Sequence, residues 1–71
     1  REPSTILYKG SKGNNVKWIQ WHLVRLKYLN WDEVDGVFGK KTHRAVCSFQ
    51  AAKALEIDGE VGAKTIAELK K

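Results

Sequence analysis

Apolar residues recur at the three- and four-residue spacing of an amphipathic helix in three stretches of the chain. The first stretch runs through Val16, Ile19, Leu23 and Leu26 and predicts a helix over residues 13–29. The second and third stretches predict a helix over residues 40–54 and a short helix over residues 62–70. Three helices of this size indicate an all-α fold, a small orthogonal three-helix bundle. The apolar positions of the second and third stretches are Ala45, Val46, Phe49, Ala52, Ile66 and Leu69.

Two nearly identical nine-residue segments precede the second and third helices. VDGVFGKKT begins at Val34 and IDGEVGAKT begins at Ile57, 23 positions later. Asp-Gly is a turn signal because Asp bonds to nearby backbone amides and Gly adopts positive φ without strain. The second Gly of each segment lies where a helix should begin. There we expect the Asp carboxylate to satisfy some of the free helix amides. Each unit is therefore a turn, an apolar plug and a helix, which gives the bundle an internal turn-helix repeat.

The acidic and sulfur-bearing residues do not form a catalytic or metal site by their spacing. Neither Asp-Gly segment carries the oxygen ligands of a calcium-binding EF-hand loop. His43 and Cys47 share a helical face, but a structural zinc site needs four ligands. Asp32, Glu33 and Asp35 lie on one loop, whereas a glycosidase pair needs two carboxylates fixed across a cleft. The sequence therefore predicts no metal, no cofactor and no catalysis within these residues, and its single cysteine excludes an internal disulfide.

Length and charge narrow the class of partner. Seventy-one residues form one small domain, and the net charge of +5 favours anionic partners such as wall polymers or nucleic acid. No apolar run approaches the roughly 18 residues that a membrane span needs. The chain starts at Arg1 without a signal-peptide pattern, so we expect an excised piece of a longer protein. Residues 1–6 are interpreted as a linker remnant and residues 7–71 as the domain.

The residues collected so far resemble the type-1 peptidoglycan-binding domain family from about Leu7 to Leu69. The resemblance covers the Gly-Ser-x-Gly start, the apolar pattern and Tyr of the first helix, and both Asp-Gly units. Ile19 stands where Leu is usual, and Lys27 replaces a Gly that often precedes the Tyr. The matching residues are Gly10, Ser11, Gly13, Val16, Gln20, Leu23, Leu26, Tyr28, Asp35, Gly36, Phe38, Gly39, Thr42, Ala45, Val46, Phe49, Gln50, Asp58, Gly59, Val61, Gly62 and Thr65.

The resemblance implies a non-catalytic module that binds peptidoglycan through its glycan strand or stem peptide. It would anchor a linked wall hydrolase, such as an amidase, glycosidase or endopeptidase, on its insoluble substrate. The implied location is the bacterial cell wall outside the membrane, including a spore cortex or a wall attacked by a phage lysin. Neither a cofactor nor a membrane partner is implied.

Candidate ligand-binding residues lie on the first helix and in the loop that follows it. Trp21, Arg25 and Tyr28 share a face opposite the predicted core, together with Lys17 and Trp18. Indole rings stack on sugars, and cationic side chains pair with carboxylates or phosphates. The alternative is that this face packs on residues 6–8 or on a neighbouring catalytic domain.

Trp31 and Asp32 could line a groove beside Phe38, Gly39 and Thr42, where helix amides suit an anion. The alternative interpretation is that Trp31 covers the core as a hydrophobic lid and that Gly39 and Thr42 only start the helix. Gln20 and Gln50 occupy matching positions on their helices, and we expect each to bond the backbone of a neighbouring loop.

Two other functions remain open at this stage. A docking module without a glycan ligand would use the tryptophan face against another protein surface. A small basic nucleic-acid-binding domain would use Lys40, Lys41, His43, Arg44 and Lys53, but the repeated turns have no role in groove docking. Nucleic acid is therefore the less favoured partner.

Overall fold

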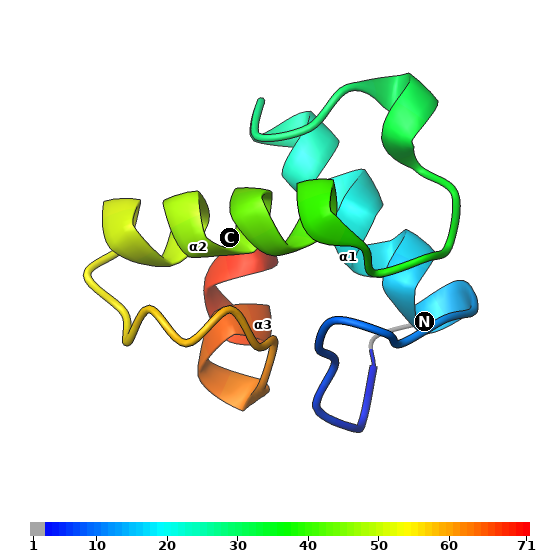
Figure 1. The fold of residues 1–71 in the computed structure, drawn as a ribbon. Helices are drawn as coiled ribbons and strands as arrows, with labels where there is room; N and C mark the ends of the chain where they lie inside the picture. The colour runs from blue at the N-terminus through cyan, green and yellow to red at the C-terminus, as the bar shows by residue number, and fades with distance from the viewer. Residues whose placement is uncertain (1–2) are drawn as a thin grey trace.

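The computed structural model describes residues 3–71 and contains three α-helices (Figure 1). They are α1 (Asn14–Arg25), α2 (Lys40–Ala52) and α3 (Ala63–Leu69), with one 3₁₀ turn, η1 (Trp31–Glu33), between α1 and α2. α1 packs against both other helices, and α2 crosses the molecule above α3. The predicted all-α three-helix fold is confirmed.

The core is formed by apolar side chains from all three helices and from the turns between them. Val16, Ile19 and Leu23 of α1 and Phe49 of α2 have no exposed surface, as the helical spacing predicted. Leu26 is only half-buried and packs against the core from its edge. Ala52 is exposed, so the predicted apolar stripe of α2 ends one turn early. The remaining buried apolar residues are Leu7, Leu29, Phe38, Ala45, Val46, Val61, Ile66 and Leu69.

The first two helices are shorter at their C-terminal ends than predicted. α1 ends at Arg25 because Lys27 adopts φ +73°, and α2 ends at Ala52 because Ala54 adopts φ +57°. At each end two backbone bonds close the last turn in the Schellman pattern. After α1 these bonds run from the Lys27 and Tyr28 amides to the Val24 and Leu23 carbonyls, at 2.9 and 2.7 Å. The prediction of a helix through residue 29 was wrong because this reversal instead turns Leu29 into the core.

The N-terminal segment pairs with both repeated turns. Leu7 exchanges two backbone hydrogen bonds with Val61, at 3.0 and 2.7 Å, and the Phe38 amide donates to the Ser11 carbonyl at 2.9 Å. The N-terminal segment therefore connects Phe38 and Val61, the buried apolar residues of the two repeated units. Pro3 is buried, and residues 3–6 line a hollow against α3. The domain boundary after residue 6 remains a prediction, and residues 1 and 2 of the proposed linker lie outside the described residues.

The two Asp-Gly turns adopt the predicted backbone conformation. Gly36 and Gly59 have φ values of +78° and +72°, and Gly39 and Gly62 lie immediately before α2 and α3. The Asp residues do not cap the helices as expected, because no side chain bonds to the first amides of α2 or α3. The Asp side chain instead bonds two residues ahead within its own turn, an Asx turn.

Candidate functional site

Each repeated turn is held by a glutamine from a neighbouring helix. The Gln20 amide nitrogen donates to Asp35 Oδ1 (3.1 Å), the Val37 carbonyl (3.1 Å) and Thr42 Oγ1 (2.9 Å), while its oxygen accepts from the Gly36 amide (2.9 Å). We call Gln20, Asp35, Gly36 and Thr42 the first clamp. The predicted structural role of Gln20 is confirmed.

The second turn repeats this arrangement atom for atom. The Gln50 amide nitrogen donates to Asp58 Oδ1 (3.0 Å), the Glu60 carbonyl (2.8 Å) and Thr65 Oγ1 (3.2 Å). Its oxygen accepts from the Gly59 amide at 3.1 Å. Gln50, Asp58, Gly59 and Thr65 form the second clamp. Among residues 3–71 no buried side-chain polar atom lacks a partner, so the clamps are complete without a ligand.

The clamps explain why the Asp carboxylates are acidic. The Val37 amide, followed by the Gln20 side chain, lowers the pKa of Asp35, and the Glu60 amide and Gln50 do the same for Asp58. A carboxyl group whose pKa is lowered stays ionised and cannot act as a general acid near neutral pH. The geometry therefore gives both aspartates a structural role.

Two of the predicted ligand-binding residues lie inside the protein. Phe38 is 1% exposed and Thr42 is 3% exposed, and the Thr42 hydroxyl is already bonded to Gln20. Neither side chain presents a surface to a ligand. The spacing of the motif could not separate a groove from a core because both place an apolar residue beside a helix start.

Trp21 and Trp31 form an exposed aromatic pair. Their ring centroids lie 6.5 Å apart at 61°, and the two residues are 45% and 63% exposed. His22 lies between Trp21 and the half-buried Trp18, with centroid distances of 5.0 and 4.3 Å. The alternative that the face of the first helix packs on residues 6–8 does not hold for Trp21, which keeps a large exposed area.

Arg25 connects α1 to the end of the chain. Its Nη2 donates to the Leu69 carbonyl at 2.8 Å and approaches His22 Nδ1 at 3.1 Å. An arginine can only donate, so Nδ1 accepts and the imidazole proton resides on Nε2. This residue was predicted to bind ligand, and the structure shows that its guanidinium is engaged in joining α1 to α3.

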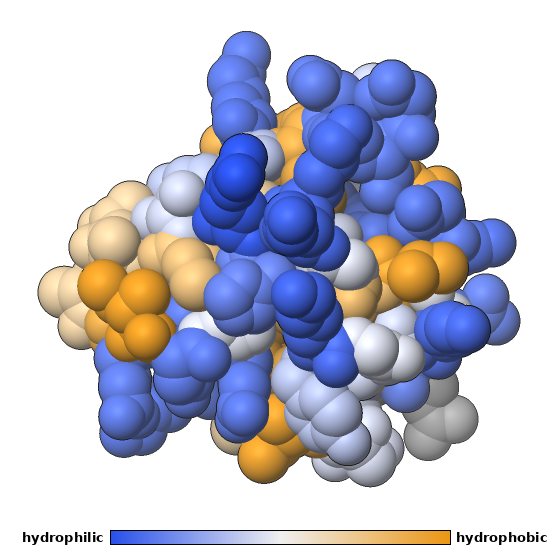
Figure 2. Space-filling model, in the orientation of Figure 1, coloured by the Kyte–Doolittle hydropathy of each residue, from blue (hydrophilic) through white to orange (hydrophobic). Residues whose placement is uncertain are grey.

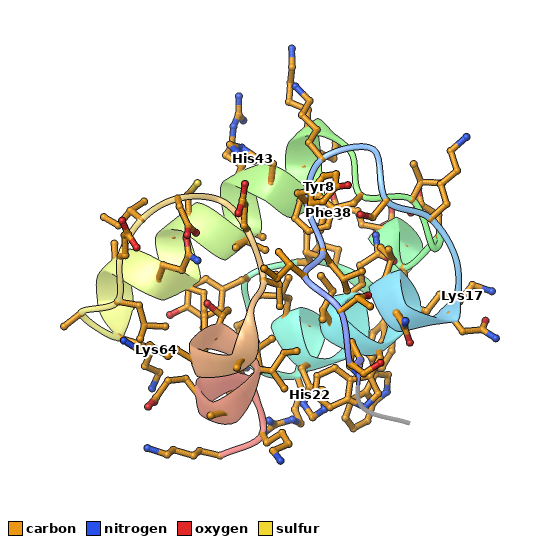
Figure 3. All side chains as sticks on the ribbon, turned by 90° about the horizontal axis from the view of Figure 1, so that it is seen from below. Tyr8, Lys17, His22, Phe38, His43 and Lys64 are labelled. Atoms are coloured by element: carbon orange, nitrogen blue, oxygen red, sulfur yellow. The ribbon has the colours of Figure 1, made fainter. Side chains whose placement is uncertain are left out.

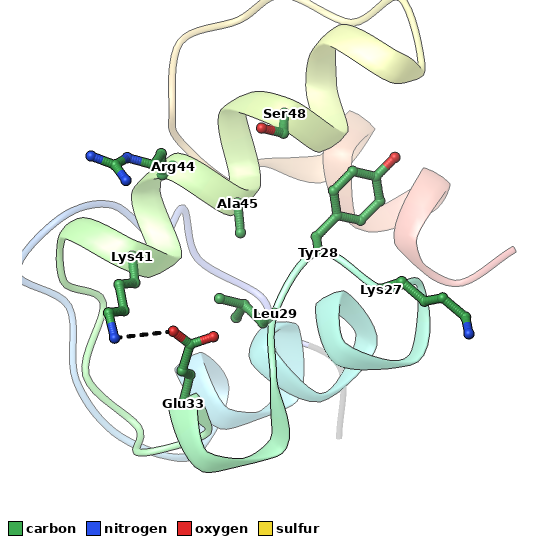
Figure 4. Close-up of a pocket in the computed structure, with 8 residues that line it drawn as sticks. All are labelled: Lys27, Tyr28, Leu29, Glu33, Lys41, Arg44, Ala45 and Ser48. Atoms are coloured by element: carbon green, nitrogen blue, oxygen red, sulfur yellow. Dashed lines mark ion pairs between the residues drawn. The ribbon is translucent and has the colours of Figure 1, made fainter.

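Tyr28 lies in an open hollow of about 370 Å³ between the end of α1 and α2 (Figure 4). Its ring packs edge-on against Phe49 with centroids 5.6 Å apart, which fixes its position. Leu29 and Ala45, both buried, form the floor of this hollow, which we call the α1–α2 hollow. Asp32 and Gly39 line a separate hollow beside the first turn. The predicted residues therefore occupy neighbouring surfaces rather than one groove.

One face of the molecule is mostly hydrophilic. On the face shown in Figure 2, hydrophobic side chains form separate spots among polar ones. Within residues 3–71, no three His, Cys, Asp or Glu side chains group as a metal site. The side chain of His43, which is labelled in Figure 3, lies over Gly59. No helix in the described part of the chain has the length and apolar character of a membrane span.

Comparison with known proteins identifies the fold. The model of the putative peptidoglycan binding domain matches residues 12–69. The chain belongs to this family. Its sequence is 35% identical over 66 residues to a spore cortex-lytic enzyme of Halalkalibacterium halodurans, covering 93% of this chain and 20% of that protein. The chain therefore spans about a fifth of that relative's length.

Two solved structures share the architecture. The SleB N-terminal domain superposes with a TM-score of 0.93 and 33% identity, covering 99% of this chain and 94% of that one. A Burkholderia AP3 phage endolysin gives a TM-score of 0.85 and 32% identity, covering 92% of this chain and 24% of the endolysin. The family predicted from the sequence is confirmed, and its description is that of a binding domain.

Proposed function

We propose that this domain binds peptidoglycan in a bacterial wall or spore cortex and holds a linked wall hydrolase on it. The observation that carries the proposal is the exposed Trp21–Trp31 pair on a scaffold whose buried side-chain polar atoms, within residues 3–71, all have partners. Large exposed aromatics on such a scaffold indicate an interaction surface. The names of the relatives, a spore cortex-lytic enzyme and a phage endolysin, support a wall polymer as its partner.

The tryptophan pair would contact the sugar rings of the glycan. Indole faces stack on apolar sugar faces, and the 61° angle between the rings lets one indole cover a face while the other touches an edge. Asp32 and the Gly39 backbone, in the hollow beside the first turn, would add polar contacts. A single weak contact of this kind suffices, because tethering raises the effective concentration of the hydrolase at its substrate.

A pelleting assay with purified sacculi free of teichoic acid tests the proposal. We expect the domain to co-sediment at low and at high salt, because stacking is not screened as charge attraction is. Trp21→Ala and Trp31→Ala should each weaken binding about two- to tenfold, the range expected for one aromatic contact. Ile57→Ala is the matched control, since Ile57 is an exposed apolar residue, 60% accessible, outside the tryptophan pair.

Failure to sediment at either salt would contradict the proposal. In that case the large exposed area of Trp31, a residue that is 63% exposed, would favour docking on a neighbouring protein domain instead. Sedimentation lost at high salt would show attraction by the net charge of +5 alone.

A further inference from the structure

The α1–α2 hollow combines an apolar floor with a cationic rim. Leu29 and Ala45 form its floor. Lys41 and Arg44 lie on one side of it and Lys27 on the other, with Tyr28 and Ser48 between (Figure 4). Its volume of about 370 Å³ lies within the range of small-molecule sites. The hollow is distinct from the tryptophan pair, which does not line it.

Two of the three cations have no acidic partner. Glu33 is held by Lys41 at 3.3 Å and by the Asn30 amide at 2.9 Å, so these contacts engage the one carboxylate of the hollow. Neither Lys27 nor Arg44 forms an ion pair with any described residue. Two positive charges therefore remain beside an apolar floor, which favours a ligand with both a carboxylate and an alkyl part.

The backbone at Lys27 is a second, independent observation. A lysine at φ +73° is strained, and a glycine would adopt the same Schellman turn without strain. Strained residues concentrate at sites where function requires their side chains. The turn itself buries Leu29, but a glycine would form the same turn, so the turn alone does not require a lysine here. The Lys27 side chain lines the hollow.

We infer that the α1–α2 hollow binds a carboxylate of the peptidoglycan stem peptide. This inference rests on the proposed function and assigns the peptide part of the polymer to a surface separate from the glycan. Arg44 and Lys27 extend outward on opposite sides of the hollow (Figure 4). Their flexible side chains attract the carboxylate from both sides, while Leu29 and Ala45 receive the alkyl part. The Tyr28 and Ser48 hydroxyls offer further hydrogen bonds at the rim.

The decisive variant is Lys27→Gly, because it separates folding from binding. Replacing Lys27 by Gly relieves the strained φ and should raise the urea midpoint of unfolding. The same variant should bind a stem peptide three- to tenfold more weakly, the range of about one typical hydrogen bond at an exposed site. Ala54→Gly is the matched control, because Ala54 holds the equivalent position after α2 at φ +57° and lies outside the hollow. It should raise the midpoint and leave binding unchanged.

The probe is a synthetic stem peptide with free carboxylates, titrated by calorimetry into the intact domain. We expect binding by the natural sequence, weaker binding by Arg44→Gln, and unchanged binding by Lys53→Gln at the far end of α2. The same peptide with amidated carboxylates should bind at least tenfold more weakly. Equal binding of the amidated peptide, equal competition by glycerol phosphate, or full binding by Lys27→Gly would overturn the inference.

Parallel pelleting with sacculi separates this inference from the proposed function. If sacculi retain the natural domain but the stem peptide does not bind, the inference fails and the proposed function stands. If neither binds, both fail. If Lys27→Gly and Trp31→Ala each weaken sacculus binding while only Lys27→Gly weakens peptide binding, both are supported.

Discussion

Gln20 Nε2 lies 2.9 Å from Thr42 Oγ1, and the corresponding atoms of Gln50 and Thr65 lie 3.2 Å apart. The two pairs form the same side-chain hydrogen bond, although their residues are 22 and 15 positions apart in the sequence. The repeated unit is therefore defined by its clamp, because the same bonds form although each glutamine approaches its turn from a different distance along the chain.

Replacing Gln50 by leucine should remove the second clamp while conserving side-chain bulk. The buried Gly59 amide would lose its acceptor and Thr65 its donor, and each unsatisfied buried group costs about 1–3 kcal/mol. We expect Gln50→Leu to lower the free energy of unfolding by about 2–4 kcal/mol in urea denaturation. Lys53→Gln, an exposed change at the end of the same helix, should stay within about 0.5 kcal/mol. A loss from Gln50→Leu no larger than that of this control would show that the clamp does not stabilise the turn.

The fold could be predicted from sequence because its signals are local. The apolar spacing of α1 and α2 and the Asp-Gly turns predicted the correct elements, and the family followed from the resemblance that these motifs carry. The predicted ends of the helices were less accurate, because Lys27 and Ala54 adopt a left-handed conformation that residues other than glycine rarely take. No propensity marks such positions, and the bonds that stabilise them form only once the chain has turned.

The site was harder to predict because exposure is a tertiary property. Phe38 and Thr42 have the residue types of a binding groove, yet the N-terminal segment and Gln20 bury them. Trp21 and Trp31 were identified, but their contact depends on η1 turning Trp31 back toward α1. Of the residues that line the α1–α2 hollow, only Tyr28 was predicted, because the others come from segments that are far apart in the sequence. The only sequence feature that pointed to the hollow was Lys27, which stands where the family often has Gly.

Gly59→Ala should destabilise the second turn more than Gly36→Ala destabilises the first. Both glycines have positive φ, so each substitution adds strain of about 1–2 kcal/mol. At Gly59 the new methyl group would also overlap the His43 imidazole ring, whereas at Gly36 it would meet the flexible Lys17 side chain at 3.1 Å. We expect the difference between the two free energies of unfolding to be about 1–3 kcal/mol.

The double variant Gly59→Ala/His43→Ala provides the control for this comparison. Removing the imidazole should recover the steric part and leave the backbone strain, so the two changes should be non-additive. Additive effects would show that His43 does not crowd the turn.

The two clamp aspartates should make the domain acid-sensitive. Hydrogen bonds from the Val37 and Glu60 amides hold the pKa values of Asp35 and Asp58 below their ordinary values. Their contribution to stability is therefore present above the unfolded pKa of about 3.9 and is lost as the pH falls through the lower folded values. The urea midpoint should fall between about pH 5 and about pH 2.

The double variant Asp35→Asn/Asp58→Asn should reduce the fall of the urea midpoint at acidic pH, because the amide oxygens accept the same hydrogen bonds but do not titrate. Asp32→Asn is the control, because Asp32 forms no hydrogen bond or ion pair in the described structure. A residual slope is expected from Glu33, whose pKa is lowered first by its bond from the Asn30 amide. An unchanged slope in the double variant would exclude the clamps as its source.

His22 should give a second pH dependence, nearer neutrality. Burial, followed by the charge of Arg25, lowers its pKa below the ordinary value of about 6.5. Arg25 donates to its Nδ1, so the folded protein favours the neutral imidazole. Between the folded and the ordinary pKa the unfolded chain binds more protons, and stability therefore falls as the pH is lowered through this range.

Tryptophan fluorescence provides a direct readout of the same protonation. The His22 ring lies 4.3 Å from Trp18 and 5.0 Å from Trp21 between ring centroids, close enough for the imidazolium to quench their emission. We expect emission to fall on acidification with an apparent pKa below about 6.5. His22→Gln should abolish this step and flatten the urea midpoint over the same pH range, while His43→Gln, remote from these indoles, should retain both. A step that survives in His22→Gln would show that another group controls the indoles, and a midpoint that rises on acidification would contradict the direction of the pKa shift.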